Sequence, residues 1–487
     1  MNRRQVVIVG AGPAGMAAAI TLCREGVSPT VIDENPQSGG QIYRQPRNVS
    51  QQSGSNEVLK DSRGNQLHRQ FQQCREQIEH LCDNTVWGIY SHRQVACNGP
   101  DGCQMFAADH LLLATGAYEY VCPFPGWTLP GVMTPGAAQS LVKSHGVRPG
   151  KTAIVAGTGP FLLVVALQLH NAGVKVAAIV ETARRRELWR HCPGLLRNLA
   201  MFVEGAGYMR KIRQAGIPML WGHVVTCAEG NGEVAAAVVA PCNEDGVADP
   251  GQARRIPVDT LCVAYGFVPR FELAQLAGCE MEYRDIKGGW IPKMDQHLAT
   301  SIPGVWVAGD GGGVAGAIVA ELEGTLAGLA IANSLGRIDT ATFQNRYRKL
   351  SRQLTKMYRF REALDRVYRV REGLTKLATE NTIVCRCEEL SCAEVDAGIE
   401  LGGTRSRTLK VMTRLGMGPC QGRMCWPAMA RRIARKTHQR VEEVGQFSFR
   451  PPTQPICLGD VLADNQTLSQ LTDHPTVMEK SMKNQMS

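Results

Sequence analysis

The chain has 487 residues, of which 44% are hydrophobic, 20% are charged and 51 are glycine; this predicts two to four globular domains and excludes disorder for most of the length. The net charge is +10, but no helix-turn-helix, zinc-finger or stacking-aromatic pattern accompanies it, which excludes the common nucleic-acid-binding classes. The 17 cysteines are expected to be reduced or metal-bound, because no export signal precedes them.

The first residues do not have the pattern of a targeting segment. Residues 1–5 form a short basic lead into an apolar strand at residues 6–9, and no cleavable apolar stretch follows. The apolar segments near Val6 and Ala153 are short and interrupted by glycine or proline, so neither is long enough to cross a bilayer. We therefore expect a cytoplasmic protein without a transmembrane segment.

The first strand leads into a dinucleotide-binding motif. Gly10, Gly12 and Gly15 form G-x-G-x-x-G at a helix start: the first permits a tight turn, the second leaves room for a pyrophosphate, and the third lets helix and strand pack closely. The next strand, at residues 29–32, ends in Asp33 and Glu34, and an acid at this spacing accepts ribose hydroxyls. The candidate cofactor-binding residues here are Gly10, Gly12, Pro13, Ala14, Gly15, Asp33 and Glu34.

Two later strand ends favour FAD over NAD as the cofactor. A Gln/Ser-rich loop is expected at about residues 45–73, and the strand at residues 111–114 then ends in Thr115 and Gly116, a small turn of the kind that passes under an adenylate. Further on, the strand at residues 304–308 precedes Gly309 and Asp310. The carboxylate is placed to bind ribityl hydroxyls, and the N-terminus of the following helix, at about Ala317, would face the flavin pyrimidine. In this order, the three motifs resemble the thioredoxin-reductase-like flavoproteins over residues 5–335.

A second dinucleotide unit follows the same plan with a departure. Strands are expected at residues 152–156 and 174–180 around the turn that contains Gly157 and Gly159, but Leu162 stands where the third glycine belongs. Glu181 still ends the following strand. A working NAD(P) site and a degenerate structural remnant therefore both stay open.

Two further features bear on the chemistry of this second unit. Arg184, Arg185 and Arg186 would either engage a 2′-phosphate or form a solvated turn. Thioredoxin reductases need a C-x-x-C redox pair in the second unit, and this sequence contains no C-x-x-C. Disulfide reduction is therefore disfavoured.

Basic residues gather in the C-terminal third of the chain. Residues 340–380 predict one long basic amphipathic helix. Residues 341–450 contain 23 lysines and arginines against 11 acidic residues, a surplus of 12 that leaves −2 for the remainder. We expect a solvated helical face, or a docking surface for an acidic partner.

Four cysteines have the spacing of an iron-sulfur site. Cys385 and Cys387 form C-x-C, and Cys420 and Cys425 form C-x4-C after a Gly-rich loop, so four thiolates could hold a [2Fe-2S] cluster. Zinc and no metal are the alternatives, but structural zinc sites use C-x2-4-C and C-x-C is tighter. Cys392 is an alternative to Cys387 as a ligand.

The predicted fold is α/β, with two tandem Rossmann-like, thioredoxin-reductase-like domains and a small C-terminal helical [2Fe-2S] domain. In it, residues 1–123 and 268–337 form a discontinuous FAD-binding domain, 124–267 a second NAD(P)-binding-like domain, 338–380 a helical linker, 381–440 the [2Fe-2S] domain and 441–487 an extended tail.

Two stretches extend the resemblance to nearly the whole chain. The run from Gly39 through Gly40 and Gln41 to Tyr43, and the run at residues 416–422, are similar to the FAD/NAD(P)-binding alpha (A) subunits of heteromeric opine oxidases, hydrogen cyanide synthases and hydroxyproline or proline dehydrogenases. The cysteine segment resembles bacterioferritin-associated-ferredoxin-like [2Fe-2S] domains, although their common form has C-x2-C at the second pair. The resemblance adds Gly40 and Gln41 to the candidate FAD-binding residues.

This resemblance implies a function without a substrate. In such complexes a separate FAD-bearing beta subunit oxidises the C–N bond of an amine or amino acid, and in some a small ferredoxin-like gamma subunit takes part. The sequence marks no catalytic residue for that oxidation. The alternatives are a self-contained NAD(P)H:acceptor reductase and a scaffold that keeps a nucleotide only for folding.

Overall fold

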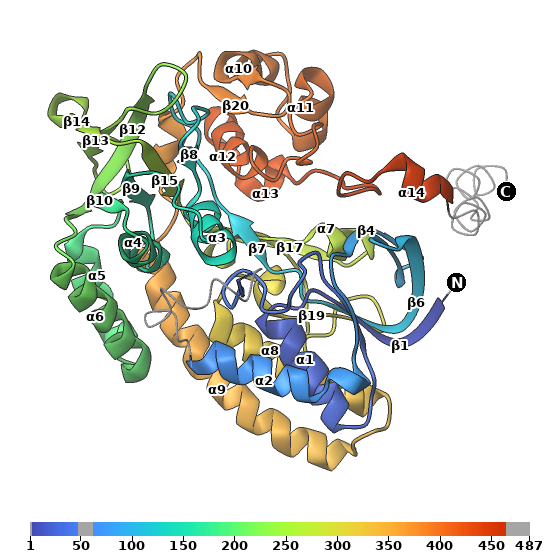
Figure 1. Ribbon diagram of the computed structural model, residues 1–487. Coiled ribbons are helices and arrows are strands. Elements are labelled where there is room, and N and C mark those ends of the chain that lie inside the picture. The colour runs from blue at the N-terminus through green and yellow to red at the C-terminus, as the bar shows by residue number, and fades with distance from the viewer. Residues whose placement is uncertain (1, 47–61, 464–487) are drawn as a thin grey trace, which may run out of the picture.

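The computed structural model describes residues 2–46 and 62–463 of the chain. Figure 1 shows one sheet with its helices in the lower half of the molecule, a second sheet at the upper left and a group of short helices at the top. The C-terminal segment crosses to the right of the second sheet toward the edge of the first (Figure 1).

The first sheet contains seven of the described strands, in the order β3-β2-β1-β6-β5-β4 with β19 beside β6. Strands β1, β2, β3, β6 and β19 pair in parallel, whereas β4 and β5 form an antiparallel extension. The strands are β1 (Asn2–Val9), β2 (Thr30–Ile32), β3 (Glu79–Leu81), β4 (Thr85–Tyr90), β5 (Gln94–Gly99), β6 (Gly102–Leu113) and β19 (Val305–Val307).

Helices α1 (Pro13–Arg24), α2 (Ser62–Gln73) and α8 (Ala317–Ser334) cover one face of this sheet. Ile8 and Leu112 are buried beneath them, whereas Val9 and Leu113 face α7 (Glu272–Leu276) on the other side. This alternation is what a parallel sheet with both faces covered requires.

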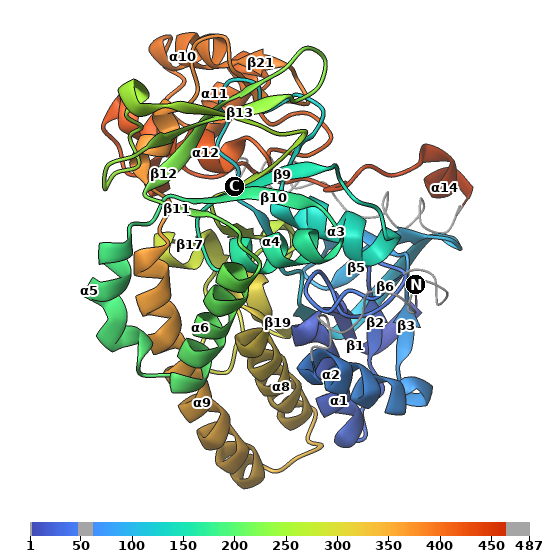
Figure 2. The ribbon, with the colours of Figure 1, turned by 60° about the vertical axis from the view of Figure 1, so that its left-hand side comes forward.

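The second sheet is entirely parallel, in the order β11-β10-β9-β15-β8. Its strands are β8 (Val132–Met133), β9 (Thr152–Gly157), β10 (Lys175–Glu181), β11 (Met219–Trp221) and β15 (Thr260–Ala264). Figure 2 shows an antiparallel three-stranded sheet above it, made of β12 (His223–Glu229), β13 (Ala236–Pro241) and β14 (Arg254–Pro257). The opposite face packs on α3 (Pro135–His145), α4 (Phe161–Asn171) and α6 (Leu199–Gln214), while α5 (Arg185–Leu195) lies farther out beside α6.

The two units are joined by a pair of antiparallel strands, β7 (Ala117–Glu119) and β16 (Phe267–Pro269). After β16, the chain forms the hairpin of β17 (Met281–Arg284) and β18 (Gly289–Pro292), and it returns to the first sheet through β19.

The long helix α9 (Thr340–Val367) leads to the C-terminal helices. These are α10 (Cys392–Glu400), α11 (Ser406–Thr413), α12 (Trp426–Thr437) and α13 (Val441–Val444), with a small bridge of β20 (Ile383–Cys385) and β21 (Leu390–Ser391). They share a core with the second unit, in which Trp127 donates to the Ile383 carbonyl at 2.6 Å. Ser391 and Glu394 have the Ser-x-x-Glu spacing of a capping box and form one at the start of α10.

Three expectations about elements need correction. The Gln/Ser-rich loop contains helix α2, because Leu67 and Phe71, four residues apart, are both buried against the first unit; residues 47–61 of that loop lie outside the described residues. The basic helix ends at Val367, and a 3-10 turn at Glu372–Lys376 follows it. The tail includes helices α13 (Val441–Val444) and α14 (Leu458–Ala463), so its described part is not wholly extended.

The domain boundaries at residues 123, 267, 337, 380 and 440 stay predictions. Within residues 2–46 and 62–463, no helix is long and apolar enough to cross a membrane.

Candidate functional site

Four parallel strands of the first sheet end at the same edge. Strands β1, β2, β6 and β19 are neighbours in the sheet, so the residues that follow them meet there. Ligands of α/β sheets bind at the carboxyl ends of such strands. The structure therefore brings together all four segments that the sequence singled out: residues 10–15, 33–34, 115–116 and 309–310.

The glycine turn has two structural glycines and one that leaves space. A Cβ on Gly10 (φ 104°) would lie 2.4 Å from the Ala114 carbonyl oxygen, and one on Gly15 would lie 1.8 Å from the Gly10 oxygen. Both are required by the fold. Gly12 has an ordinary φ of −74°, and the nearest atom to a Cβ there is the Gly40 Cα at 3.9 Å. A Cβ at Gly12 would thus meet no close neighbour, which leaves room beside Gly40 at the start of α1.

A second glycine pair folds over this turn. The Gly39 amide donates to the Ala11 carbonyl at 2.8 Å, and a Cβ on Gly40 (φ 58°) would lie 2.9 Å from the Gly12 Cα. Gln41 is exposed next to it and accepts from Arg44 at 2.8 Å. The loop after β2 therefore forms one wall of the space at Gly12.

The two acids after β2 have different environments. Asp33 is buried and accepts from the Ala11 amide at 2.5 Å and the Asn35 amide at 2.7 Å; burial raises its pKa. Glu34 is more exposed, and its carboxylate pairs with Arg270 at 2.7 Å. Burial opposes its ionisation, but the Arg270 charge prevails and lowers the pKa of Glu34. Asp33 thus holds the glycine turn, while Glu34 is the accessible anion.

Arg270 also fastens the turn after β6, a role that sequence reasoning missed. The Thr115 hydroxyl donates to the Arg270 carbonyl at 2.6 Å, and the Arg270 amide donates to the Gly116 carbonyl at 2.9 Å. Arg270 follows β16, in the segment that returns from the second unit. Its contacts therefore connect that segment to the ends of β2 and β6 in the first unit. A single arginine outside any motif carries no sequence signal for this.

The end of β19 is held by a buried acid that sequence reasoning also missed. Glu323 of α8 accepts from the Gly309 amide at 2.7 Å and from the Tyr358 hydroxyl of α9, and burial raises its pKa to about 7. Asp310 accepts from the amides of Ala315 and Gly316 at 2.9 and 3.0 Å. These contacts shape the loop that leads to Ala317, the first residue of α8.

The four cysteines of the predicted cluster site converge as two pairs. Cys385 and Cys425 are buried, and a hydrogen bond from the Cys425 thiol lowers the pKa of Cys385 to about 6, together with backbone amides that include Gly416. Cys387 contacts Cys420, and burial raises the pKa of Cys387. A Cβ on Gly418 would lie 2.2 Å from the Cys387 Cβ, so the Gly-rich loop wraps tightly around this pair.

Among the residues that the structure describes, no group of three or more His, Cys, Asp or Glu side chains is close enough to hold a metal ion. The hydrogen bond with Cys385 and burial raise the pKa of Cys425, and the charge of Cys420 adds to this effect. Cys385 likewise adds to the effect of burial on the pKa of Cys387, so the two thiol pairs affect each other. Cys392 does not join them. It is buried at the start of α10, where burial raises its pKa, and its charged neighbours include Arg432 and Asp396.

The cysteine segment lies against the first unit. Arg423, between Cys420 and Cys425, pairs with the buried Glu272 of α7 at 2.6 Å, and its charge also lowers the pKa of Glu34. The two candidate cofactor sites are therefore neighbours.

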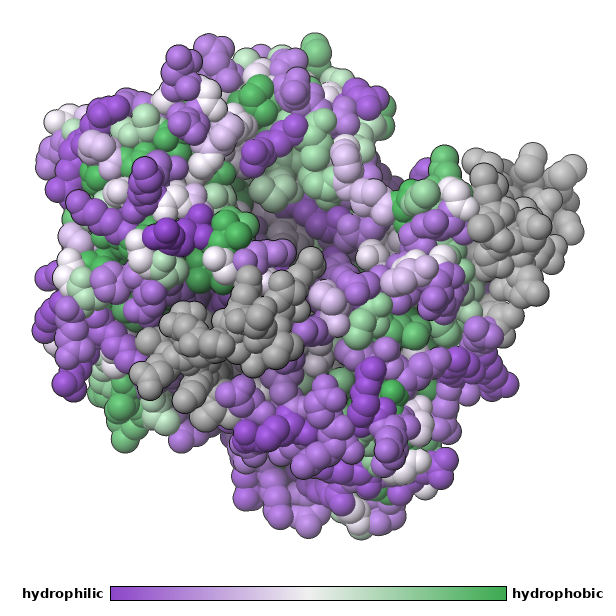
Figure 3. All heavy atoms as spheres, viewed as in Figure 1, coloured by the Kyte–Doolittle hydropathy of each residue, from purple (hydrophilic) through white to green (hydrophobic). Residues whose placement is uncertain are grey.

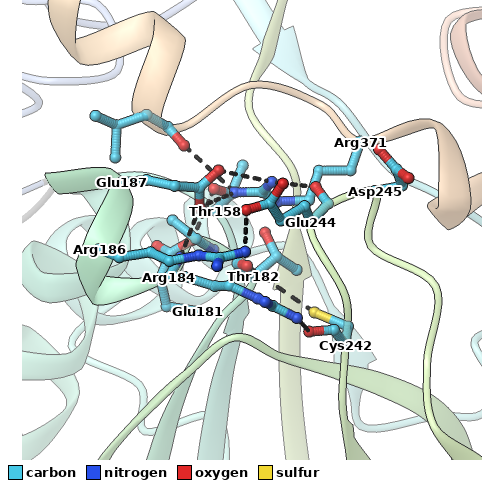
Figure 4. A network of polar contacts seen from close by, with 12 residues as sticks. Thr158, Glu181, Thr182, Arg184, Arg186, Glu187, Cys242, Glu244, Asp245 and Arg371 are labelled. Carbon is cyan, nitrogen blue, oxygen red and sulfur yellow. Dashed lines mark hydrogen bonds and ion pairs between the residues drawn. The ribbon is translucent and has the colours of Figure 1, made fainter. Parts of the chain in front are cut away.

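The turn of the second unit uses its acid internally. Glu181 accepts from the Thr158 hydroxyl at 2.7 Å, and Figure 4 shows these two residues. It also accepts from the amides of Gly159 and Ala183 at 2.9 and 2.8 Å. Burial raises the pKa of Glu181 to about 7. Leu162 is the second residue of α4, and its side chain is buried in the core that this helix forms with the second sheet.

Two of the three consecutive arginines also have partners within the chain. Arg184 donates to the Cys242 carbonyl at 2.5 Å, and Arg186 pairs with Glu244 (Figure 4). Arg371, from the segment after α9, is buried beside them and pairs with Glu187 at 2.7 Å. Arg184 and Arg186 are thus occupied by contacts within the chain.

Residues 4–324 match the family model for pyridine nucleotide-disulphide oxidoreductases, and residues 379–465 match the sarcosine oxidase A3 domain. The chain is 34% identical to the HcnB subunit of hydrogen cyanide synthase from Pseudomonas protegens, covering 95% of this chain and 98% of the relative. It is 33% identical to the A subunit of opine oxidase from Agrobacterium tumefaciens, covering 94% and 91%.

Among solved structures, L-proline dehydrogenase from P. horikoshii superposes with a TM-score of 0.68 and 21% identity, over 94% of this chain and 80% of that chain. Thioredoxin reductase from T. acidophilum gives 0.51 and 20%, over 69% and 99%. At such identities the likeness shows the fold alone, and the predicted α/β, thioredoxin-reductase-like class is confirmed. The chain is therefore an oxidoreductase of the pyridine nucleotide-disulphide oxidoreductase family, within the group that contains the HcnB subunit of hydrogen cyanide synthase and the A subunit of opine oxidase.

Proposed function

We propose that this chain is the electron-transferring FAD and [2Fe-2S] subunit of a heteromeric amine or amino-acid dehydrogenase, acting with a partner that oxidises the C–N bond of an opine, a hydroxyproline or a similar substrate. The observation that carries this proposal is the Arg423–Glu272 ion pair, which holds the cysteine segment against the candidate FAD site. Two adjacent redox sites in one chain support electron transfer between them. The names of the relatives, which are oxidase and synthase subunits, support the heteromeric assembly.

The residues at the edge of the first sheet fit FAD, which membership of this family implies. The open space at Gly12 and the amides of α1 would bind the pyrophosphate, and Glu34 would accept the adenosine ribose hydroxyls. Asp310 and the start of α8 at Ala317 would face the ribityl chain and the flavin ring. A bound flavin supplies reversible hydride and single-electron chemistry; the protein positions it and shields it from water.

The donor set of Cys385, Cys387, Cys420 and Cys425 fits a [2Fe-2S] cluster. Four thiolates satisfy two irons, and amides that point at sulfur, as at Cys385, stabilise the anionic ligands. C-x-C places its two thiols closer than an ordinary zinc knuckle does. We propose that the two thiol pairs close around the cluster when it is inserted.

One cavity beside the loop of Cys420 and Cys425 is too small for an amino-acid substrate. It lies between β16, β18 and α12, is lined by aromatic side chains such as Tyr118 and Trp290, and has a volume of about 60 Å³. Ordinary ligand sites measure about 300–1,000 Å³. This supports the placement of C–N oxidation on an FAD-bearing beta subunit. In some complexes a small ferredoxin-like gamma subunit would be a further component.

We further propose that the second dinucleotide unit is a structural remnant and that the complex works in the cytoplasm. Glu181, Arg184 and Arg186 are occupied by contacts within the chain, which argues against NAD(P) binding. None of the 17 cysteines, all of which lie in the described residues, forms a disulfide, which agrees with a reducing compartment.

The test is to purify the chain by itself and together with its partner, and to assay both preparations against secondary amines with a dye acceptor. The chain by itself should contain FAD, iron and sulfide but show no turnover, whereas the complex should reduce the dye. Robust turnover by the isolated chain would place the substrate site in this chain. Rapid bleaching of its flavin by NADH or NADPH would instead support a self-contained NAD(P)H:acceptor reductase.

A further inference from the structure

A basic cleft lies between helices α5 and α9, formed by residues that neither candidate cofactor site uses. Its volume is about 270 Å³, and its charged lining consists of Arg190, Arg197, Arg359, Arg366 and Glu362. Four arginines against one glutamate give the lining a charge of +3.

The helices hold these arginines in a fixed arrangement. Arg190 and Arg197 are seven residues apart in and just after α5, and Arg359 and Arg366 are seven apart on α9. Because seven residues make about two helical turns, the α9 pair lies on one face of its helix. A Cβ on Gly194 would lie 2.6 Å from the Ala363 Cβ, so the two helices touch at the cleft. The small core around Leu195, Phe360 and Ala363 fixes that contact.

Three of the four guanidinium groups have no partner among residues 2–46 and 62–463. Arg366 pairs with Glu362 at 2.6 Å. Within the part of the chain that the structure describes, the side chains of Arg190, Arg197 and Arg359 make no hydrogen bond or ion pair. Cations gathered in one cleft repel each other, and a bound anion would relieve that repulsion.

We propose that this cleft binds a phosphate group of an anionic ligand. Guanidinium groups present paired N–H donors that match phosphate oxygens, and several arginines from two helices can surround such a group. The volume corresponds to about nine water molecules, enough for one to three phosphates but too little for a helix of a protein partner, which is about 10–12 Å across.

The phosphate can come from a soluble compound or from a phospholipid headgroup, and the neighbouring surface separates these sources. Trp189, Leu199 and Val203 are 78%, 63% and 66% exposed beside the cleft. Figure 3 shows hydrophobic side chains gathered at the lower left, over the end of α5 and α6. A lipid would use this apolar surface together with the cleft, whereas a soluble phosphate would use the cleft alone.

The experiment titrates the full-length chain with inorganic pyrophosphate by calorimetry, and measures its sedimentation with phosphatidylglycerol and with phosphatidylcholine vesicles. The test variant carries Arg190→Gln and Arg359→Gln. The control carries Arg213→Gln and Arg254→Gln, which change the net charge equally at exposed positions outside the cleft. A third variant carries Leu199→Ser and Val203→Ser.

The proposal expects the test variant, but not the control, to lose about 100-fold in affinity, since each charge-assisted contact is worth about tenfold or more. If the variant with Leu199→Ser and Val203→Ser binds pyrophosphate as tightly as the native chain does, the ligand is a soluble phosphate. Selective binding to phosphatidylglycerol vesicles that both the test and serine variants abolish identifies a lipid headgroup. The proposal is overturned if the native chain binds neither pyrophosphate nor phosphatidylglycerol vesicles. It is also overturned if the test and control variants lose equal affinity.

Discussion

Arg423, in the loop between Cys420 and Cys425, donates to the buried carboxylate of Glu272 at 2.6 Å and joins the cysteine segment to the first dinucleotide unit. Both side chains are largely removed from solvent, at 14% and 4% exposure. Removing one partner of a buried ion pair leaves the other charge uncompensated.

Arg423→Leu should therefore lower the free energy of unfolding by about 3–5 kcal/mol, measured by urea denaturation. The double variant Arg423→Leu with Glu272→Leu should recover much of that loss, because no charge stays buried without a partner. Equal stability of the single and double variants would show that the pair does not join the two regions.

Gly12 and Gly15 should respond differently to substitution. Gly12→Val should abolish FAD binding while the chain stays folded, because the side chain would fill the open space where we place the pyrophosphate. Gly15→Ala should unfold or strongly destabilise the first unit, since its Cβ would meet the Gly10 carbonyl oxygen at 1.8 Å. Flavin content and circular dichroism measure the two effects; full flavin content in folded Gly12→Val would remove the FAD site from this edge.

Four of the cysteines should behave as cluster ligands, whereas Cys392 should not. Serine at Cys385, Cys387, Cys420 or Cys425 should remove iron and acid-labile sulfide, which we expect at about two each per chain in the native protein. Cys392→Ser should retain both, because Cys392 lies with Arg432 and Asp396 instead of with the other thiols. Metal and sulfide analysis decides this, and stoichiometric zinc would contradict the cluster.

Glu323 should make stability depend on pH. Its pKa in the folded chain is raised to about 7 by burial, above the ordinary value of 4.5, so the unfolded chain releases this proton first as the pH rises. The free energy of unfolding should consequently fall between about pH 4.5 and 7, by an amount on the order of 3 kcal/mol.

Glu323→Gln should flatten that dependence without removing it, because Glu181 has the same raised pKa of about 7 in the second unit. Urea denaturation at a series of pH values measures the slope. A slope unchanged in Glu323→Gln would show that this carboxyl is ionised in the folded protein.

Arg371 should be important for the second unit. Its side chain is fully buried and pairs with Glu187 and with the Glu244 carbonyl at 2.7 and 2.6 Å (Figure 4). Arg371→Met should cost about 3–5 kcal/mol of stability. The neighbouring Arg186→Gln, which breaks an exposed pair with Glu244, should cost less than about 1 kcal/mol. Similar losses in the two variants, measured by thermal unfolding, would contradict this distinction.

Sequence alone determined the features that depend on consecutive residues. The G-x-G-x-x-G turn, the strands around it and the Ser391–Glu394 capping box could be predicted because backbone sterics and local hydrogen bonds dictate them. The apolar strands that end at Thr115 and Gly309 were also recognisable in the sequence. Their meeting at one place could be expected because the carboxyl ends of parallel strands share one edge of a sheet.

Only the tertiary structure decided which side chains hold that edge together. Arg270 reaches Glu34 across 236 residues of sequence, and Arg371 reaches Glu187 across 184. Such pairs have no period or spacing, so nothing in the local sequence marks them. Helix α2 escaped prediction for a related reason: its polar sequence becomes helical because Leu67 and Phe71 find a buried surface that the rest of the chain provides.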